Sequence, residues 1–254
     1  MFIVNIEYPG TWLELPDGED VSELTSIISS METTITDMAI TLTMFTDCQQ
    51  KSYLEHTSDN TEDLWERDRQ LRMHIEKNYR DGLDDENDFY TNHEYHRAET
   101  ERLYRQEKLN SGEVPRSYKN RFSFIHAHSF LSLVDSFYKY LSVISDETNL
   151  GHVKSIKEQF EEAFPLLSKV RNSAQHSEDR IRGYGRSKKK KMDLQGGFLG
   201  LSNLNGDLLG YTIDDGTYQE FSISHDTLIR VSKLFQNLLN GFSWTGSIRF
   251  SPYI

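Results

Sequence analysis

The sequence predicts a mainly α fold, a helical bundle with a small antiparallel β-meander inserted before its last helix. Three observations predict it. Long segments repeat their apolar residues at helical spacing, an Asn-Gly and an Asp-Gly pair mark hairpin turns late in the chain, and helical spacing returns after these turns. At 254 residues the chain is long enough for one sizeable domain with an insertion or for two small ones, and we favour one. The expected order is a β-prone segment at 1–20, a helical bundle at 21–182 with charged peripheral helices at 59–109, a basic loop and β-meander at 183–223, a final helix at 224–241 and a tail at 242–254.

Two long helices are expected to form the spine of the bundle. The first begins near Val21, and its apolar residues keep almost strict heptad spacing, which predicts long antiparallel packing against another helix. They are Leu24, Ile28, Met31, Ile35, Met38, Leu42 and Phe45. The expected partner runs from about Arg121 to Ile144 and has a wide apolar face, formed by Ala127, Phe130, Leu131, Val134, Phe137, Tyr138, Leu141 and Ile144.

The meander and the last helix follow from turn and cap signals. Asn205-Gly206 and Asp215-Gly216 separate short apolar or alternating runs, which predicts three antiparallel strands between Phe198 and Ser222. The final helix then starts at Ser224 as N-cap and stops at Gly241. Its expected buried residues are Leu228, Val231, Leu234, Phe235 and Leu238.

The segment 59–109 is strongly charged and carries only modest apolar stripes. Such a segment is typical of peripheral helices with solvated faces, and the cluster Asp84-Asp85-Glu86 indicates a break or a helix start. A mobile acidic arm that contacts a partner is the alternative. His93 and His96 have the i, i+3 spacing of a metal pair, but an ordinary exposed face is the better interpretation, and we assign no metal to the chain.

The most informative residues lie late in the bundle, at Arg171-Asn172-Ser173-Ala174-Gln175-His176. Pro165 is suited to the first position of this helix, and Leu167, Val170, Ala174 and Ile181 form its expected core-facing stripe. At 100° per residue, Asn172 and His176 each lie about 160° from Ala174 and therefore face away from the core. Arg171 lies about 140° from His176 on a straight helix, so its long side chain or a loosened helix end at Gly183 must close the gap.

An R-N-x-x-x-H string on a late bundle helix resembles the signature of the HEPN superfamily, small all-α domains that include many metal-independent ribonucleases. The resemblance covers the bundle from Val21 to Arg182 and the last helix, and its motif is short. It implies a HEPN-like bundle that forms a homodimer, in which two such helices meet and build a composite site that cleaves RNA. It also implies a toxin or an antiviral defence effector, with a neutralising antitoxin or a defence-system protein as partner.

The residue types suit that chemistry without a cofactor. The Arg171 guanidinium would neutralise charge on the nonbridging oxygens of the scissile phosphate. His176 would act as general base toward the ribose 2′-OH or as general acid toward the leaving oxygen, with a second His176 in the other role. Asn172 would orient His176 or donate a hydrogen bond to the phosphate. Attack by the 2′-OH predicts cyclic-phosphate ends and no cleavage of DNA.

Two other interpretations of the motif stay open. In the first, Arg171 pairs with Glu178 or with an acid of a neighbouring helix, and His176 only forms hydrogen bonds. In the second, the chain is a noncatalytic HEPN-like module that binds a nucleotide or a protein, such as the neutralising member of a toxin pair. A further possible class of function is a structural adaptor that binds its partners through the charged middle helices.

The stretch that follows the motif helix is basic and contains no acid from Arg180 to Lys191. Its candidate RNA contacts are Arg180, Arg182, Tyr184, Arg186, Lys188, Lys189, Lys190 and Lys191. The run is either a guide for RNA beside the site or a solvated loop before the meander. Because the net charge is −12, any RNA site must be local. A single cysteine, the absence of a signal-peptide pattern and the absence of a long apolar run predict a cytoplasmic protein without membrane contact.

Overall fold

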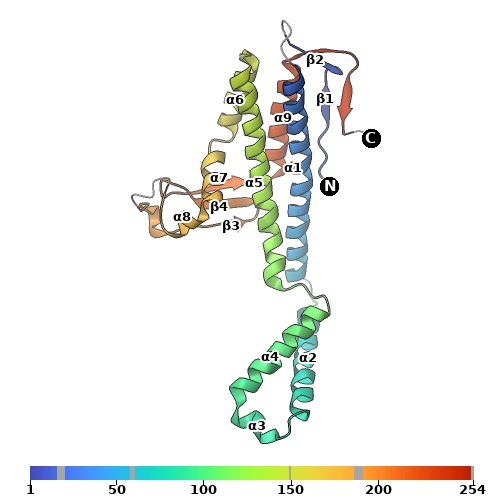
Figure 1. Ribbon diagram of the computed structural model, residues 1–254, viewed down its shortest axis with the longest axis vertical. Coiled ribbons are helices and arrows are strands. Elements are labelled where there is room, and N and C mark those ends of the chain that lie inside the picture. The colour runs from blue at the N-terminus through green and yellow to red at the C-terminus, as the bar shows by residue number, and fades with distance from the viewer. Residues whose placement is uncertain (16–20, 58–60, 149, 186–190, 253–254) are drawn as a thin grey trace. The chain divides into compact units, whose positions relative to one another are not determined.

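The computed structural model describes residues 1–15, 21–57, 61–148, 150–185 and 191–252 (Figure 1). The chain divides into two compact units, one of Met1–Asp47 with Ser123–Ile254 and one of Cys48–Phe122. The long helices α1 (Val21–Thr57) and α5 (Arg116–Glu147) each contribute residues to both units. The mainly α class with a small β-meander is confirmed. The prediction of a single domain concerns whether the chain folds as one cooperative unit, and it stays a prediction.

The first unit holds the core of the bundle. Its further helices are α6 (Gly151–Ala163), α7 (Leu167–Gln175), α8 (Ser177–Ile181) and α9 (His225–Asn240), with a 3₁₀ helix η2 (Gln195–Gly197). Its strands are β1 (Ile6–Tyr8), β2 (Trp12–Glu14), β3 (Asn203–Asn205), β4 (Leu208–Thr212), β5 (Tyr218–Ser222), β6 (Ser243–Thr245) and β7 (Arg249–Ser251).

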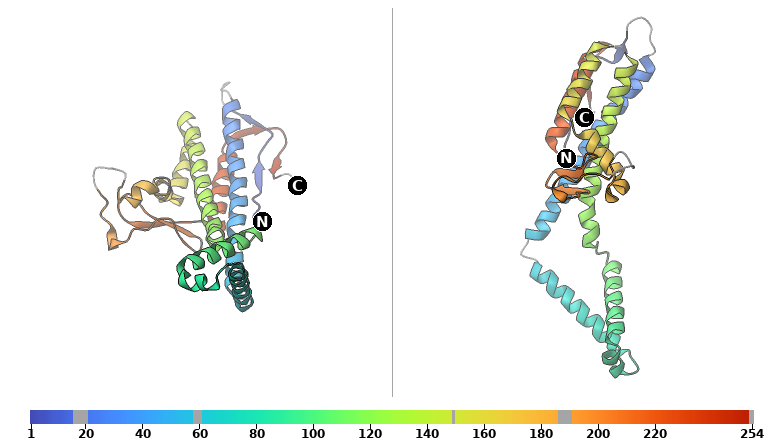
Figure 2. Two further views of the ribbon diagram at one scale, coloured as in Figure 1. Left: turned by 60° about the horizontal axis from the view of Figure 1, so that its bottom comes forward. Right: turned by 90° about the vertical axis from the view of Figure 1, so that its left-hand side faces the viewer.

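In this unit α1 and α5 run antiparallel beside each other, with α9 next to them (Figures 1 and 2). The predicted apolar series of both long helices are buried in one continuous core, and only Tyr138 is partly exposed. All five predicted core residues of α9 are buried as well. Helix α9 starts as expected, because the Ser224 hydroxyl accepts a hydrogen bond from the amide of Thr227 at 3.3 Å. Heptad spacing in α1 and the apolar faces predicted for α5 and α9 therefore located the buried sides of these helices correctly.

The predicted three-stranded meander is confirmed as β3-β4-β5, with antiparallel pairing throughout. Gly206 and Gly216 have φ of 60° and 86°, the left-handed conformation that favours glycine in tight turns. Helix α7 packs against β4 and β5, so the meander supports the motif helix from one side.

The two ends of the chain pair with each other. Strand β1 pairs with β7 and β2 with β6, both antiparallel. Residues 243–245 and 249–251, which were expected in a tail, are therefore paired strands, and the N-terminal segment forms two short strands on either side of Pro9-Gly10. Strands of three residues are too short to show a clear alternation of apolar and polar side chains, so the local sequence pattern could not predict this pairing.

The second unit contains α2 (Thr61–Asp81), α3 (Glu86–Thr91) and α4 (His93–Asn110), and α2 packs against α4. The charged segment is therefore helical, as expected, and Asp85 is the N-cap of α3 through a 2.9 Å bond from the amide of Asn87. The expectation of an exposed face at His96 is wrong. Its ring is 2% exposed and contacts the Tyr79 hydroxyl and the Asp88 carboxylate at 2.9 and 3.0 Å.

Over the described part of the chain, no helix combines the length and the apolar character needed to cross a bilayer.

Candidate functional site

The motif lies on α7 and on the break that follows it. Leu167, Val170 and Ser173 are buried, and Ala174 is partly buried against the core, so the inward face is close to the predicted stripe. The helix begins two residues after Pro165, which was expected as its first residue. Asn172 and His176 are exposed, as the helical geometry predicted.

The helix does not continue to Gly183. It ends at Gln175, and His176 has φ −113° and ψ 41°, outside the helical region. The carbonyl of His176 then accepts bonds from the amides of Asp179 and Arg180 at 3.1 and 3.2 Å, which start the short helix α8. This break reorients the next turn, so Ile181, expected in the core, is 65% exposed. The predicted loosening at Gly183 occurs seven residues earlier, at His176.

The Arg171 side chain is held by three neighbours. Its Nε donates to Asp135 Oδ1 at 2.8 Å, and its Nη1 donates to Asn172 Oδ1 at 2.7 Å and to Gln175 Oε1 at 3.1 Å. The side chain is 19% exposed, so it is fixed at a half-buried position that still reaches solvent. The motif thus brings Arg171, Asn172 and Gln175 together. Among the described residues, no hydrogen bond or ion pair joins Arg171 to His176.

Asp135 on α5 is the partner of Arg171, an acid of a neighbouring helix as one of the open interpretations expected, but it was not among the residues named from the sequence. Its side chain is 3% exposed, and its second oxygen Oδ2 forms an ion pair with Lys139 Nζ at 2.8 Å. A buried carboxylate is costly unless it is paired, and here two cations share it, which leaves a local excess of one positive charge. A signal was present in the sequence, because Asp135 is the only acid between Val114 and Ser145 and lies within the apolar face of α5.

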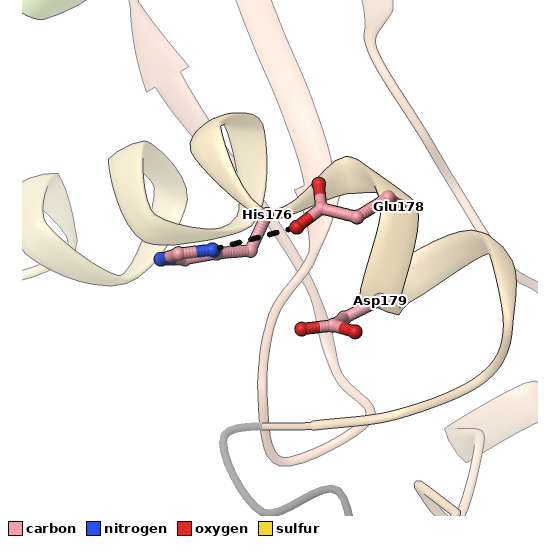
Figure 3. Close-up of side chains that lie close together, drawn as sticks. All are labelled: His176, Glu178 and Asp179. Atoms are coloured by element: carbon pink, nitrogen blue, oxygen red, sulfur yellow. Dashed lines mark ion pairs between the residues drawn. The ribbon is translucent and has the colours of Figure 1, made fainter.

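His176 lies at the surface beside two acids, Glu178 and Asp179 (Figure 3). Its imidazole is 59% exposed, and its Nδ1 lies 3.7 Å from Glu178 Oε1, too far for a hydrogen bond. Within the described ranges, the ring takes part in no hydrogen bond, and more than half of it is open to solvent. Asp179 is 5% exposed and lies 3.7 Å from Arg182 Nη1.

The basic residues after the motif separate into three groups. Arg180 is 3% exposed and bonds internally to Ser173 Oγ and to the carbonyl of Tyr184, so it does not lie on the surface that an RNA contact requires. Arg182 is exposed and lies over the Tyr184 ring at 5.2 Å, and Lys191 is exposed. Residues 186–190, which include Arg186, Lys188, Lys189 and Lys190, lie outside the described residues.

Comparison with known protein families, with curated proteins and with solved structures found no match in any of the three.

Proposed function

We propose that this protein is a metal-independent endoribonuclease of the HEPN type, which cleaves RNA by attack of the ribose 2′-OH and leaves cyclic-phosphate ends. The observation that carries the proposal is that one short helix presents a guanidinium fixed by Asp135 and, directly after its last residue, an exposed imidazole. A fixed cation and a titratable base are the two groups that this reaction needs.

The contacts of Arg171 support a role at a phosphate. Asp135 and Asn172 hold Nε and Nη1, which orients the planar group and leaves Nη2 without a partner among the described residues. A preoriented donor loses little entropy when it binds an anion. The Asn172 oxygen accepts from Arg171, so its amide nitrogen is the group that would donate, either to the phosphate or to His176.

His176 would move the proton. Because its ring is exposed at the break after α7, an RNA strand could reach it from solvent. One imidazole cannot serve as base and acid in the same step, so we propose a homodimer in which the partner's copy of this histidine takes the second role. An enzyme of this kind would act as a toxin or a defence effector, controlled by a protein partner. The exposed Arg182 and Lys191 and the lysines at 188–190 would guide the RNA toward it.

The experiment is incubation of purified protein with total RNA and with DNA, in buffer that contains EDTA. We expect cleavage of RNA alone, with 2′,3′-cyclic phosphate ends. His176→Ala and Arg171→Ala should each lower the rate by about 10² to 10⁴, because each removes a group that acts in the transition state.

Matched controls exist on the same chain. His93 is exposed on α4, and Arg230 is an exposed arginine on α9 whose ion pair among the described residues is with Asp226 of the same helix. His93→Ala and Arg230→Ala should cleave like the wild type. A folded His176→Ala protein with wild-type activity would exclude the catalytic role.

The second candidate is a noncatalytic module that binds a nucleotide or a protein. The same Arg171 contacts favour it, because Asp135, Asn172 and Gln175 are the partners expected of a structural arginine. Growth arrest on expression that disappears with His176→Ala separates the two, since a noncatalytic module gives no arrest through this residue.

A further inference from the structure

Three side chains with metal-ligating atoms converge beside the motif. One ligand atom each of His176, Glu178 and Asp179 lies within 4.8 Å of the other two (Figure 3). All three come from one short segment, whose backbone is fixed by bonds from the amides of Asp179 and Arg180 to the His176 carbonyl and from the amide of Tyr184 to the Asp179 carbonyl. The donor set is one imidazole nitrogen and two carboxylate oxygens.

The helix break creates this arrangement. On a regular helix His176 and Glu178 would lie about 160° apart and could not meet one ion. The nonhelical backbone of His176 instead brings its Nδ1 to 3.7 Å from Glu178 Oε1. This separation is too long for a hydrogen bond. It is close to the edge of a tetrahedron around an ion with bonds of about 2.0 to 2.2 Å, roughly 3.3 to 3.6 Å.

The ligand types select the ion. Imidazole nitrogen combined with carboxylate oxygen suits Zn²⁺, whereas Mg²⁺ and Ca²⁺ prefer oxygen alone. Three protein ligands leave the fourth tetrahedral position to water. Asp179 is 5% exposed and therefore a fixed ligand, while Glu178, 65% exposed, can adjust. Arg182, 3.7 Å from Asp179, is 64% exposed, so it can turn to solvent when a cation enters.

We propose that His176, Glu178 and Asp179 form a zinc site and that the bound ion inhibits the protein. The binding site stands without the proposed function, whereas the inhibition rests on it. An imidazole nitrogen bound to zinc cannot take up a proton, so His176 with its Nδ1 on the ion can no longer cycle between base and acid. Zinc would thus hold the enzyme inactive, and its removal would release His176.

The test separates binding from activity. Protein freed of metal by EDTA and dialysed is titrated with zinc chloride in a calorimeter. Glu178→Gln should raise the zinc concentration at half-saturation on the order of 10-fold or more, because it removes a ligand atom. The matched control is Glu162→Gln on α6, an equally conservative change of an exposed glutamate outside the cluster, which should bind like the wild type. Equal affinity and stoichiometry in wild type and Glu178→Gln would overturn the site.

The second arm measures RNA cleavage against zinc concentration. Wild type and Glu162→Gln should lose activity as zinc saturates the site, and Glu178→Gln should need on the order of 10-fold or more zinc for the same loss. If binding depends on Glu178 and zinc leaves cleavage unchanged, the inhibitory role is wrong. If no variant cleaves RNA even in EDTA, the proposed function and the inhibition both fall, and the calorimetric result still decides the site.

Discussion

At the scale of single residues, Asp135 is a charged side chain buried within the helical bundle. Its neighbours Val134 and Phe137 are fully buried, and its own side chain is 3% exposed. Arg171 and Lys139 satisfy one oxygen each, so the carboxylate links the motif helix α7 to the long helix α5. We regard Asp135 as a positioning residue, since it acts through Arg171.

Replacement of Asp135 by Asn should destabilise the protein by about 2 to 3 kcal/mol, since it breaks a buried pair whose cations can still reach solvent. If the proposed function holds, RNA cleavage should also fall, because Arg171 loses its orientation. The control is Asp146→Asn on the same helix, where the carboxylate is 73% exposed and pairs with Lys157 at 3.3 Å. That change should stay within about 0.5 kcal/mol. Urea unfolding of both variants checks the prediction, and equal stabilities would contradict it.

At the scale of elements, the packing of α6 against α9 encloses a histidine. His152 on α6 has its Nε2 buried, with no hydrogen-bond partner among the described residues. Its ring lies edge-on to Phe242, with 4.7 Å between the ring centroids. Burial disfavours the charged imidazole and lowers the pKa of His152 below its ordinary value of 6.5.

This lowered pKa makes stability depend on pH in a defined direction. Below pH 6.5 the unfolded chain binds a proton at His152 more readily than the folded protein does. The contribution of neutral His152 to the free energy of unfolding is therefore complete above pH 6.5 and is lost as the pH falls toward the lowered pKa. His152→Gln removes this group. The free energy of unfolding should therefore fall less between pH 7.5 and 5.5 in the variant, by at most about 1.4 kcal/mol, because this range ends one pH unit below 6.5.

The control for this series is His93→Gln, a change of an exposed histidine on α4. Its pH curve should run parallel to that of the wild type. If His152→Gln gives the same slope as His93→Gln, the buried imidazole does not account for the pH dependence.

At the scale of the whole molecule, the proposed chemistry requires a second copy. The exposed face of α7 that carries Asn172 and His176 offers one imidazole, and the step needs a base and an acid. We therefore expect a homodimer with this face at or near the interface. A mixed dimer of wild type and His176→Ala, isolated through two tags, should lose at least 10-fold in rate, because its composite site then lacks one of the two histidines.

Light scattering and the activity of the mixed dimer check this together. Two independent sites would leave the mixed dimer with half of the wild-type activity. A monomer with full activity would show that no second copy is needed.

The sequence by itself determined the elements whose information is local. Periodicity placed the buried faces of α1, α5 and α9, and two glycine turns placed the meander, because helix and hairpin patterns repeat within a few residues. It also placed Asn172 and His176 on the exposed side of the motif helix.

Only the tertiary structure decided what these residues contact. Arg171 meets Asp135 from 36 positions earlier in the chain, and β1 pairs with β7 from the other end. Arg180 and His96, both expected at the surface, are buried because neighbouring elements supply partners for their polar atoms. The break at His176 brings Glu178 beside it, and Arg180 of α8 then bonds back to Ser173 of α7, a contact that apolar periodicity does not predict. Partners distant in sequence are chosen by packing and by the cost of an unpaired buried charge, and both exist only once the chain has folded.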